Sequence, residues 1–277
     1  MEIKLTACIV TYNNDIEKLK KAIRSFLNTN ISVKLFIVDN SRFDALKTLV
    51  DIDLNNIIYI HNPTNPGFGA AHNLGIEKAK EYSSKYHIIL NPDIYFSIGV
   101  NEEIIRYMET DPSVGLVMPK ILYPNGENQF LCKLLPRPID LIARRFFPKV
   151  KIFNRMIEKY ELRDFNYDSI ENIPYLSGCF MFCKTDVLSE IGGFDDRFFM
   201  YLEDTDLCRR IHLKYKTIFY PKVVVFHYFE KGSYRNYKLL KHHIKSAFNY
   251  FNKWGWFFDK ERSEFNKNCA KGITNVK

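Results

Sequence analysis

The sequence predicts an α/β fold with a mostly parallel central sheet, helices on both faces and a basic helical segment at the C-terminal end. Short apolar, β-branched runs typical of buried parallel strands alternate with segments whose apolar residues recur at helical spacing. Polar residues follow several of these runs directly, at the edge where open α/β sheets bind their ligands. With 277 residues, of which 46% are hydrophobic, the chain can bury a sizeable core.

The alternation is clearest in the first half of the chain. Residues 5–12 predict a central strand, and apolar residues at helical spacing predict a helix after Asn14 or Asp15, either of which can cap it. A second helix is expected from about Ala70. Further strands are predicted at 33–38, 57–60 and 86–90.

The second half is more irregular. A strand is predicted at 114–122, and a basic, aromatic excursion from the sheet follows at 131–160. The apolar run 173–183 predicts a strand that is interrupted by Ser177 and Gly178. The remaining predicted elements are a helix that begins with the acidic cluster 203–206, a last strand at 223–228 and a helix at 237–254.

Polar side chains lie where three of the predicted strands end. Asn13 follows the first strand and Asp39 ends the second, whereas Asn91 and Asp93 flank Pro92, which stops the fourth because proline has no amide proton to donate. A carboxylate such as Asp93 can hold a hard divalent cation against a diphosphate. Asp39 can accept the ring N–H of a uracil or thymine base. The alternative for the Asn-Pro-Asp stretch is a simple turn.

Gly67 and Gly69 belong to a loop that nearly matches a dinucleotide-binding fingerprint. The match fails at His72, where the fingerprint has glycine or alanine, and the loop follows the third strand instead of the first. We expect the two glycines to let the backbone pass close to a nucleotide or its phosphates, with a plain tight turn as the alternative.

Three acids, Glu203, Asp204 and Asp206, fall in the first turn of a predicted helix. Carboxylates at this position interact favourably with the helix dipole, which is by itself a sufficient structural explanation for them.

The net charge of +8 is concentrated at the C-terminal end. Residues 230–277 contain 11 Lys and Arg against 4 Asp and Glu, with aromatic residues interleaved. This mixture suits an anionic membrane surface better than a nucleic-acid groove, so we expect the segment from Tyr234 to Phe258 to lie on such a membrane. The alternative is a solvated basic helix that covers the core.

Cysteine usage and hydropathy indicate a cytoplasmic protein. The six cysteines lack zinc-ligand spacing, which indicates buried, reduced thiols. No apolar run approaches the roughly 18 residues needed to span a bilayer, and the N-terminus leads directly into a strand without a signal pattern. We therefore expect a peripheral location at the inner face of the cell membrane.

Seven short motifs together resemble a family 2 glycosyltransferase of the GT-A type. In that family's order, over roughly residues 4–230, they are Thr11-Tyr12-Asn13, Val38-Asp39-Asn40-Ser41, Asn65-Pro66-Gly67-Phe68-Gly69, Asn91-Pro92-Asp93, Ser177-Gly178-Cys179, Gly193-Phe194-Asp195 and Tyr201-Leu202-Glu203-Asp204-Thr205-Asp206. Their combination is similar to the bacterial rhamnosyltransferase-like branch, whose members build surface polysaccharides from dTDP-L-rhamnose and related donors.

The resemblance implies a domain organisation. A GT-A domain would span residues 1–230, with a nucleotide-binding half at about 1–120 and an acceptor half at about 121–230. A basic, aromatic, helical extension would follow at 231–277.

The resemblance also implies roles for individual residues. The nucleotide would be bound by Thr11, Tyr12, Asn13, Asp39, Gly67, Gly69 and Asn91. A divalent metal, Mg²⁺ or Mn²⁺, would be held by Asp93, with His227 near the metal or the phosphates. Asp204 would be the general base with Glu203 assisting, and the sugar and acceptor pocket would be bordered by Ser177, Gly178 and Asp206. Asn91 replaces an Asp of the family's motif, and one fewer charge should weaken the affinity for the metal.

The implied function is an inverting, metal-dependent transfer of L-rhamnose from dTDP-L-rhamnose to a hydroxyl of a growing, lipid-linked bacterial surface polysaccharide. The alternatives are a UDP-hexose or furanose donor and a catalytically silent nucleotide-sugar-binding protein. A nucleotidyltransferase is disfavoured because residues 11–14 contain no phosphate-binding glycine. The expected partners are the nucleotide sugar, the lipid-linked saccharide and an anionic membrane, without nucleic acid; a homodimer is a further option.

Overall fold

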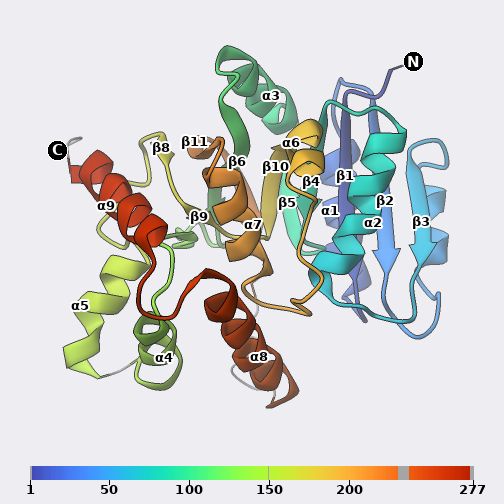
Figure 1. The fold of residues 1–277 in the computed structure, drawn as a ribbon. Helices are drawn as coiled ribbons and strands as arrows, with labels where there is room; N and C mark the ends of the chain where they lie inside the picture. Colours follow the sequence, from blue (N-terminus) through green and yellow to red (C-terminus); the bar gives the residue numbers. More distant parts are fainter. Residues whose placement is uncertain (1, 149, 230–236, 275–277) are drawn as a thin grey trace.

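The protein forms one large mixed sheet flanked by helices, with a small two-stranded sheet beside it (Figure 1). The computed structural model describes residues 2–148, 150–229 and 237–274. Its strands are β1 (Leu5–Thr11), β2 (Val33–Asp39), β3 (Ile57–His61), β4 (Tyr86–Leu90), β5 (Ile94–Phe96), β6 (Val114–Leu122), β7 (Cys132–Lys133), β8 (Glu171–Asn172), β9 (Tyr175–Leu176), β10 (Phe180–Lys184) and β11 (Lys216–His227). Its helices are α1 (Ile16–Leu27), η1 (Lys47–Ile52), α2 (Phe68–Glu81), α3 (Val100–Thr110), α4 (Pro138–Phe146), α5 (Lys151–Tyr160), α6 (Thr185–Glu190), α7 (Glu203–His212), α8 (Tyr237–Trp254) and α9 (Lys260–Thr274).

Strand pairing brings several chain segments to one edge of the sheet. Within the described residues the nine-stranded sheet has the order β3-β2-β1-β4-β10-β6-β11-β5, and β8 pairs with β11. β1 is parallel to both β2 and β4, so Thr11 lies opposite Asp39 and Ile9 opposite Leu90. β10 is antiparallel to β4, which sets its first residue, Phe180, opposite Leu90. The residues after β1, β2 and β4 therefore meet those before β10, and the predicted, mostly parallel sheet is confirmed.

Helices cover both faces of this sheet, as predicted. Ala7 and Ile9 of β1 belong to the same apolar cluster as the buried face of α1, whereas Cys8 and Val10 cluster with Ala71 of α2. Because successive strand residues point to opposite faces, α1 and α2 lie on opposite sides of β1. α1 begins after Asp15, whose carboxylate accepts hydrogen bonds from two amides of the first turn.

Several elements differ from the expectation. The single strand predicted over 173–183 is divided, because the chain turns at Ser177 and Gly178: β9 pairs with β7 in the small sheet, and β10 joins the large one. The strand predicted at 223–228 is only the end of the longer β11. The sequence analysis does not predict the helices α3 and α9. The sequence of α9 is mostly polar, and only the helical spacing of Phe265, Cys269 and Ile273 indicates a buried face.

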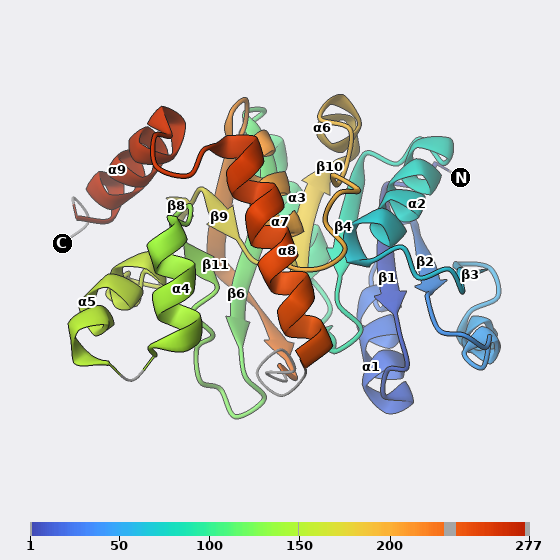
Figure 2. The same ribbon diagram turned by 60° about the horizontal axis from the view of Figure 1, so that its bottom comes forward.

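The C-terminal helices pack into the main core. Tyr250 and Phe251 of α8 and Cys269 of α9 belong to the same apolar cluster as the sheet. Figure 2 shows α8 crossing over α7, and the indole of Trp254 donates a hydrogen bond to Asp206 there, at 2.8 Å. The expected boundary at 230/231 and the start of the expected membrane segment at Tyr234 lie outside the described residues.

Two features bear on cellular context. All six cysteines are buried and unbridged. Among the helices that the structure describes, none has the length and apolarity required to cross a membrane.

A buried ion pair joins α7 to the start of α9. The guanidinium of Arg209 donates two hydrogen bonds of 2.6 Å to the carboxylate of Asp259, and both side chains are at most 2% exposed. Glu261 approaches the same guanidinium at 3.0 Å, and the ring of Trp254 lies 4.1 Å from its carbon. Removing one partner of such a pair leaves the other charge buried.

We expect Asp259→Asn to lower the free energy of unfolding by about 3 kcal/mol, the lower end of the range for broken buried ion pairs, because Glu261 remains. The substitution keeps a side chain that can cap α9. Urea denaturation measures the change. Lys216→Ala, which breaks the solvent-exposed pair with Asp111, is the control and should have a much smaller effect. Equal effects of the two substitutions would contradict a tertiary role for the buried pair.

Candidate active site

Asp39 is a buried carboxylate held by three neighbours. Its Oδ1 accepts hydrogen bonds from the Thr11 hydroxyl at 3.0 Å and the Ser41 amide at 2.9 Å, and its Oδ2 accepts one from the Tyr59 hydroxyl at 2.7 Å. Burial opposes ionisation, but the bonds from Ser41, Tyr59 and Thr11 outweigh it and lower the pKa of Asp39. Oδ2 has a lone pair left for one further donor.

The loop after β1 turns sharply toward this carboxylate. Asn13 has a left-handed backbone, with φ of 53°, and its amide donates to the Ser41 hydroxyl at 2.9 Å. Tyr12 is 58% exposed, so its ring is accessible from solvent next to Thr11. Thr11, Tyr12, Asn13 and Asp39 therefore lie close together, as strand pairing requires, and their expected contact with a nucleotide stays a prediction.

The glycines of the 67–69 loop approach another part of the protein. A Cβ on Gly67 would lie 2.2 Å from the backbone oxygen of Phe199, and one on Gly69 would lie 2.9 Å from the Cβ of Phe194. The amide of Phe68 donates to the same Phe199 oxygen at 2.8 Å. The small size of Gly67 and Gly69 therefore lets α2 pack against the segment that leads to α7, and their expected approach to a nucleotide stays a prediction.

Asp93 and His227 are neighbours because of strand pairing. β5 is antiparallel to β11 and sets Ile94 opposite His227, so Asp93 lies beside the histidine. The His227 Nε2 is 3.3 Å from the Asp93 Oδ1, and its Nδ1 is 3.0 Å from the amide oxygen of Gln129. The side chain of Gln129 also donates a hydrogen bond to the His227 carbonyl at 2.9 Å. The two contacts of Gln129 together orient the imidazole ring.

These groups offer part of a cation site. The Asp93 Oδ1 is buried, and the polar neighbour that the structure gives it is the His227 Nε2 at 3.3 Å. Burial alone would lower the pKa of His227, but Cys179 and Asp93 raise it to about 10, so a cation would have to displace the imidazolium proton. No cluster of three or more His, Cys, Asp or Glu side chains suited to a metal occurs in the described part of the chain. Asp93 and His227 thus fit a cation whose remaining ligands come from a bound diphosphate and water.

Asp204 is held at the same edge by the turn between β9 and β10. Its Oδ2 accepts hydrogen bonds from the Gly178 amide at 3.0 Å and the Tyr175 hydroxyl at 3.2 Å. A Cβ on Gly178 would lie 2.9 Å from the Asp204 Cβ, so only glycine allows this approach. Ser177, the neighbour of Gly178, is half-buried in the same turn.

A short backbone path connects this carboxylate to Asp93. The amide of Asn91 donates to the carbonyl of Cys179 at 2.9 Å, and Cys179 directly follows Gly178. The base candidate and the cation candidate therefore border one region, with Asn91, Ser177 and Gly178 between them.

Glu203 is buried, with 6% exposure, and its Oε2 has no hydrogen-bond partner in the described residues. Burial and the neighbouring Asp204 carboxylate raise the pKa of Glu203 well above its usual range. Glu203 is therefore harder to ionise than an ordinary glutamate, whereas the half-buried Asp204 lies closer to solvent.

Asp206 points away from this region. It is fully buried, its Oδ2 accepts from Arg210 at 2.8 Å, and its Oδ1 lies 2.7 Å from the Lys253 ammonium and 2.8 Å from the Trp254 indole nitrogen. These contacts join α7 to α8. The described contacts of Asp206 do not support its expected position beside the acceptor, which stays a prediction.

Four residues of the site have no sequence signal strong enough to identify them. Tyr59 and Tyr175 each orient a carboxylate, and Gln129 orients His227. Lys133 is 5% exposed and its ammonium lies 5.0 Å from the centre of the Tyr175 ring. Burial, aided by Arg144, lowers the pKa of Lys133 to about 8. All four reach the site through pairings between segments that are distant in the sequence.

Comparison with known proteins identifies relatives of this chain. The chain is 24% identical over 215 residues to N-acetylglucosaminyl-diphospho-decaprenol L-rhamnosyltransferase of Mycobacterium tuberculosis, covering 73% of this chain and 68% of the relative. It is 24% identical over 248 residues to rhamnosyltransferase WbbL of Escherichia coli, covering 87% and 90%. The low-salt glycan biosynthesis hexosyltransferase Agl10 of Haloferax volcanii is 25% identical over 212 residues, covering 74% and 61%.

Two solved structures share the fold at low sequence identity. GalNAc-T7, crystallised with UDP, GalNAc and Mn²⁺, superimposes with a TM-score of 0.67 at 14% identity, over 99% of this chain and 58% of that one. TarS of Staphylococcus aureus gives 0.60 at 15% identity, over 99% and 43%. Both are GT-A glycosyltransferases, so the predicted GT-A fold is confirmed. A model of the family described as glycosyl transferase family 2 matches residues 6–192, and the chain therefore belongs to this family, as a rhamnosyltransferase-like member.

Proposed function

We propose that this chain transfers L-rhamnose from dTDP-L-rhamnose to a hydroxyl of a lipid-linked bacterial glycan, with inversion at the anomeric carbon. The observation that carries the proposal is the Asp204 carboxylate, held by Gly178 and Tyr175 within one short turn of the Asn91–Asp93 region. The names of two relatives support rhamnose as the sugar, and one of those names includes a diphospho-decaprenol acceptor. A UDP-hexose or furanose donor is the alternative.

The nucleotide would bind at the ends of β1 and β2. Asp39 is ionised and retains one acceptor position, which suits the imide N–H of thymine or uracil. Thr11 and Tyr59 would keep the carboxylate oriented, and the exposed ring of Tyr12 would cover the base. Asn13 and Asn91 would contact the ribose and the phosphates from either side.

The leaving diphosphate would be bound beside Asp93 and His227. A Mg²⁺ or Mn²⁺ ion, when bound there, would stabilise the charge that grows on the departing nucleoside diphosphate. The chain's own contribution is to hold the Asp93 carboxylate against the diphosphate, and Gln129 keeps the His227 ring from rotating away.

Asp204 would remove the proton of the acceptor hydroxyl as that oxygen attacks the anomeric carbon. A single displacement with one base inverts the configuration, so a β-linked donor would give an α-linked product. The Gly178 amide and the Tyr175 hydroxyl keep the Oδ2 of Asp204 in place. Glu203 is buried and its pKa is raised by that burial, so its role would be to support the helix start or the acceptor contact.

Membrane association would bring the site to its acceptor. The rings of Phe248, Phe257 and Phe258 project from the C-terminal region with exposures of 54%, 82% and 98%, among the lysines of α8. Exposed aromatic and basic side chains together favour an anionic leaflet.

We expect Asp204→Asn to lower kcat by about 10²–10⁴-fold, the usual contribution of a general base, with donor binding retained. Glu203→Gln should affect kcat less, because it replaces a neutral acid by a neutral amide. The assay uses dTDP-L-rhamnose within a panel of sugar nucleotides and an N-acetylglucosaminyl diphospholipid as acceptor. An active Asp204→Asn with an inactive Glu203→Gln would reverse the two roles, and binding of donor without turnover by the unmutated enzyme would indicate a silent binding protein.

The protonation of Glu203 has its own test in folding. The pKa of Glu203 is raised in the folded state. Its contribution to the free energy of unfolding is therefore fully present below the unfolded pKa of about 4.3, and it is lost as pH rises toward the folded pKa. Glu203→Gln removes this loss. The melting temperature of the variant minus that of the unmutated protein should therefore increase from pH 4.5 to 7.5, as measured by calorimetry. The exposed Glu158→Gln is the control and should give a constant difference; an equally constant difference for Glu203→Gln would show that Glu203 is ionised.

Metal dependence provides a further test. Asp93→Asn keeps the size of the side chain and removes the only charge of its motif, so transfer should nearly cease while the melting temperature changes little. Activity of the unmutated enzyme should be lost in excess chelator and restored by Mg²⁺ or Mn²⁺, since the proposed ligands are oxygen atoms and one imidazole. Full activity in chelator would exclude the proposed cation role.

A further inference from the structure

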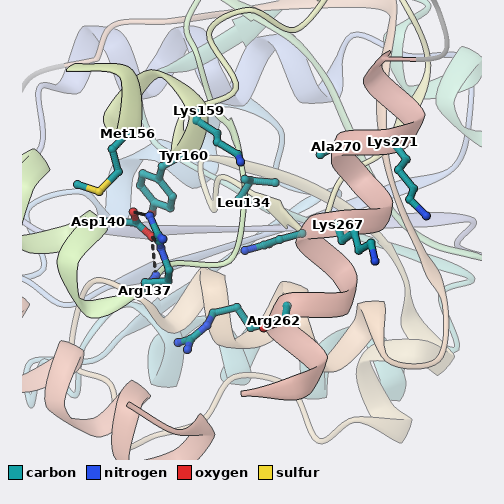
Figure 3. Close-up of a pocket in the computed structure, with 12 residues that line it drawn as sticks. Leu134, Arg137, Asp140, Met156, Lys159, Tyr160, Arg262, Lys267, Ala270 and Lys271 are labelled. Atoms are coloured by element: carbon teal, nitrogen blue, oxygen red, sulfur yellow. Dashed lines mark hydrogen bonds and ion pairs between the residues drawn. The ribbon is translucent and has the colours of Figure 1, made fainter. Parts of the chain in front are cut away.

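A cavity of about 540 Å³ lies between α4, α5 and α9, at the end of the molecule opposite β3 in Figures 1 and 2. Figure 3 shows its lining: Lys159 comes from α5, Lys267 and Lys271 from α9, and Arg137 from the start of α4. Leu134, Met156 and Tyr160 supply apolar surface between these charges. The cavity thus combines hydrocarbon walls with cationic side chains from three helices.

The two most basic stretches of the sequence meet here. Arg137 and Lys159 belong to the excursion 131–160, whereas Arg262, Lys267 and Lys271 belong to the C-terminal extension. The one carboxylate in the lining, Asp140, already accepts hydrogen bonds of 2.9 and 2.7 Å from Arg137. Neither Lys159 nor Lys267 forms an ion pair with any residue that the structure describes. Bringing like charges together opposes folding, and a bound anion would offset this repulsion.

Hydrogen bonds between side chains of α9 and the backbone before α4 hold two sides of the cavity together. The side chain of Asn266 accepts from the Leu135 amide at 2.8 Å and donates to the Leu135 carbonyl at 3.0 Å. Arg262 is 4% exposed and donates to the carbonyls of Pro136 and Phe257. These bonds tie α9 to the segment before α4, so the backbone on these two sides of the cavity is held in place before any ligand binds.

The cavity is separate from the Asp204 site. Leu134 lines the cavity, whereas the preceding residue, Lys133, lies over Tyr175 on the side of Asp204. Because successive residues of an extended chain point in opposite directions, this segment separates the two regions.

We propose that the cavity binds the phosphate end of a membrane lipid. A phosphate fits the uncompensated ammonium groups of Lys159 and Lys267, and the glycerol and first methylene groups fit the walls of Leu134, Met156 and Tyr160. Inorganic phosphate alone would leave these apolar walls without a partner. The inference goes beyond the proposed sugar transfer and does not depend on it, since it assigns a second site.

The test is a calorimetric titration of the full chain with dihexanoyl phosphatidic acid, kept below its critical micelle concentration so that no membrane surface is present for α8. Chelator is included to prevent phosphate from binding with a metal at Asp93. The lipid should bind about 10-fold or more tightly than inorganic phosphate, because it also buries hydrocarbon. Lys159→Met with Lys267→Met should weaken lipid binding by about 10- to 100-fold, since two charge-assisted contacts are lost.

Two further variants separate site binding from general charge. Lys159→Arg with Lys267→Arg keeps both charges and should retain binding. Lys47→Met with Lys222→Met removes two exposed lysines outside the cavity and should leave the titration unchanged. Equal affinity for lipid and inorganic phosphate, or equal losses in the two methionine variants, would overturn the proposal. Sugar transfer is measured in parallel, so that failure of the transferase proposal and failure of the lipid site give different results.

Discussion

The structure depends on one buried helix, α7, whose side chains fix three other parts of the chain. Asp204 joins it to the turn between β9 and β10, Asp206 joins it to α8, and Arg209 joins it to the start of α9. The thiol of Cys208 also donates to the Leu176 carbonyl at 3.1 Å. Charged groups buried this deeply are tolerated because nearly all of them find partners, so any shift of α7 would break several bonds together.

The start of this helix is the strained point of the fold. Tyr201 and Leu202 both have left-handed backbones, with φ of 71° and 63°, although neither is glycine. Such conformations persist only where surrounding contacts enforce them. Here the enforcing contacts are the Gly67 backbone against Phe199 and the Ser246 hydroxyl on the Met200 carbonyl. The strain sets Asp204 toward Gly178 and turns Asp206 toward α8, which gives neighbouring acids different environments and different chemistry.

Carboxylates and cationic side chains gather in different parts of the molecule. The edge that carries Asp39, Asp93 and Asp204 gathers carboxylates, each oriented by a tyrosine, a histidine or backbone amides. The far end gathers cations around the cavity of α4, α5 and α9. The first arrangement suits nucleotide, cation and hydroxyl chemistry. The second suits the proposed phosphate site, which lies apart from the proposed donor site.

Local pattern in the sequence determined the strands β1, β2, β4 and β6, the helix α1 and the mostly parallel sheet, because hydrophobic period is a property of short segments. It left the cap of α1 open between Asn14 and Asp15, and the structure shows Asp15. It also placed Asp39 and Asp93 at strand ends, since parallel pairing makes those ends coincide. Tertiary structure alone decided that Gly67 and Gly69 meet Phe199 and Phe194. It alone decided that Glu203 is buried and has a raised pKa, that Asp206 holds α8, and that two basic segments form one cavity. The reason is physical: burial, protonation and close approach depend on neighbours brought from far along the chain, and one strand or helix does not contain them.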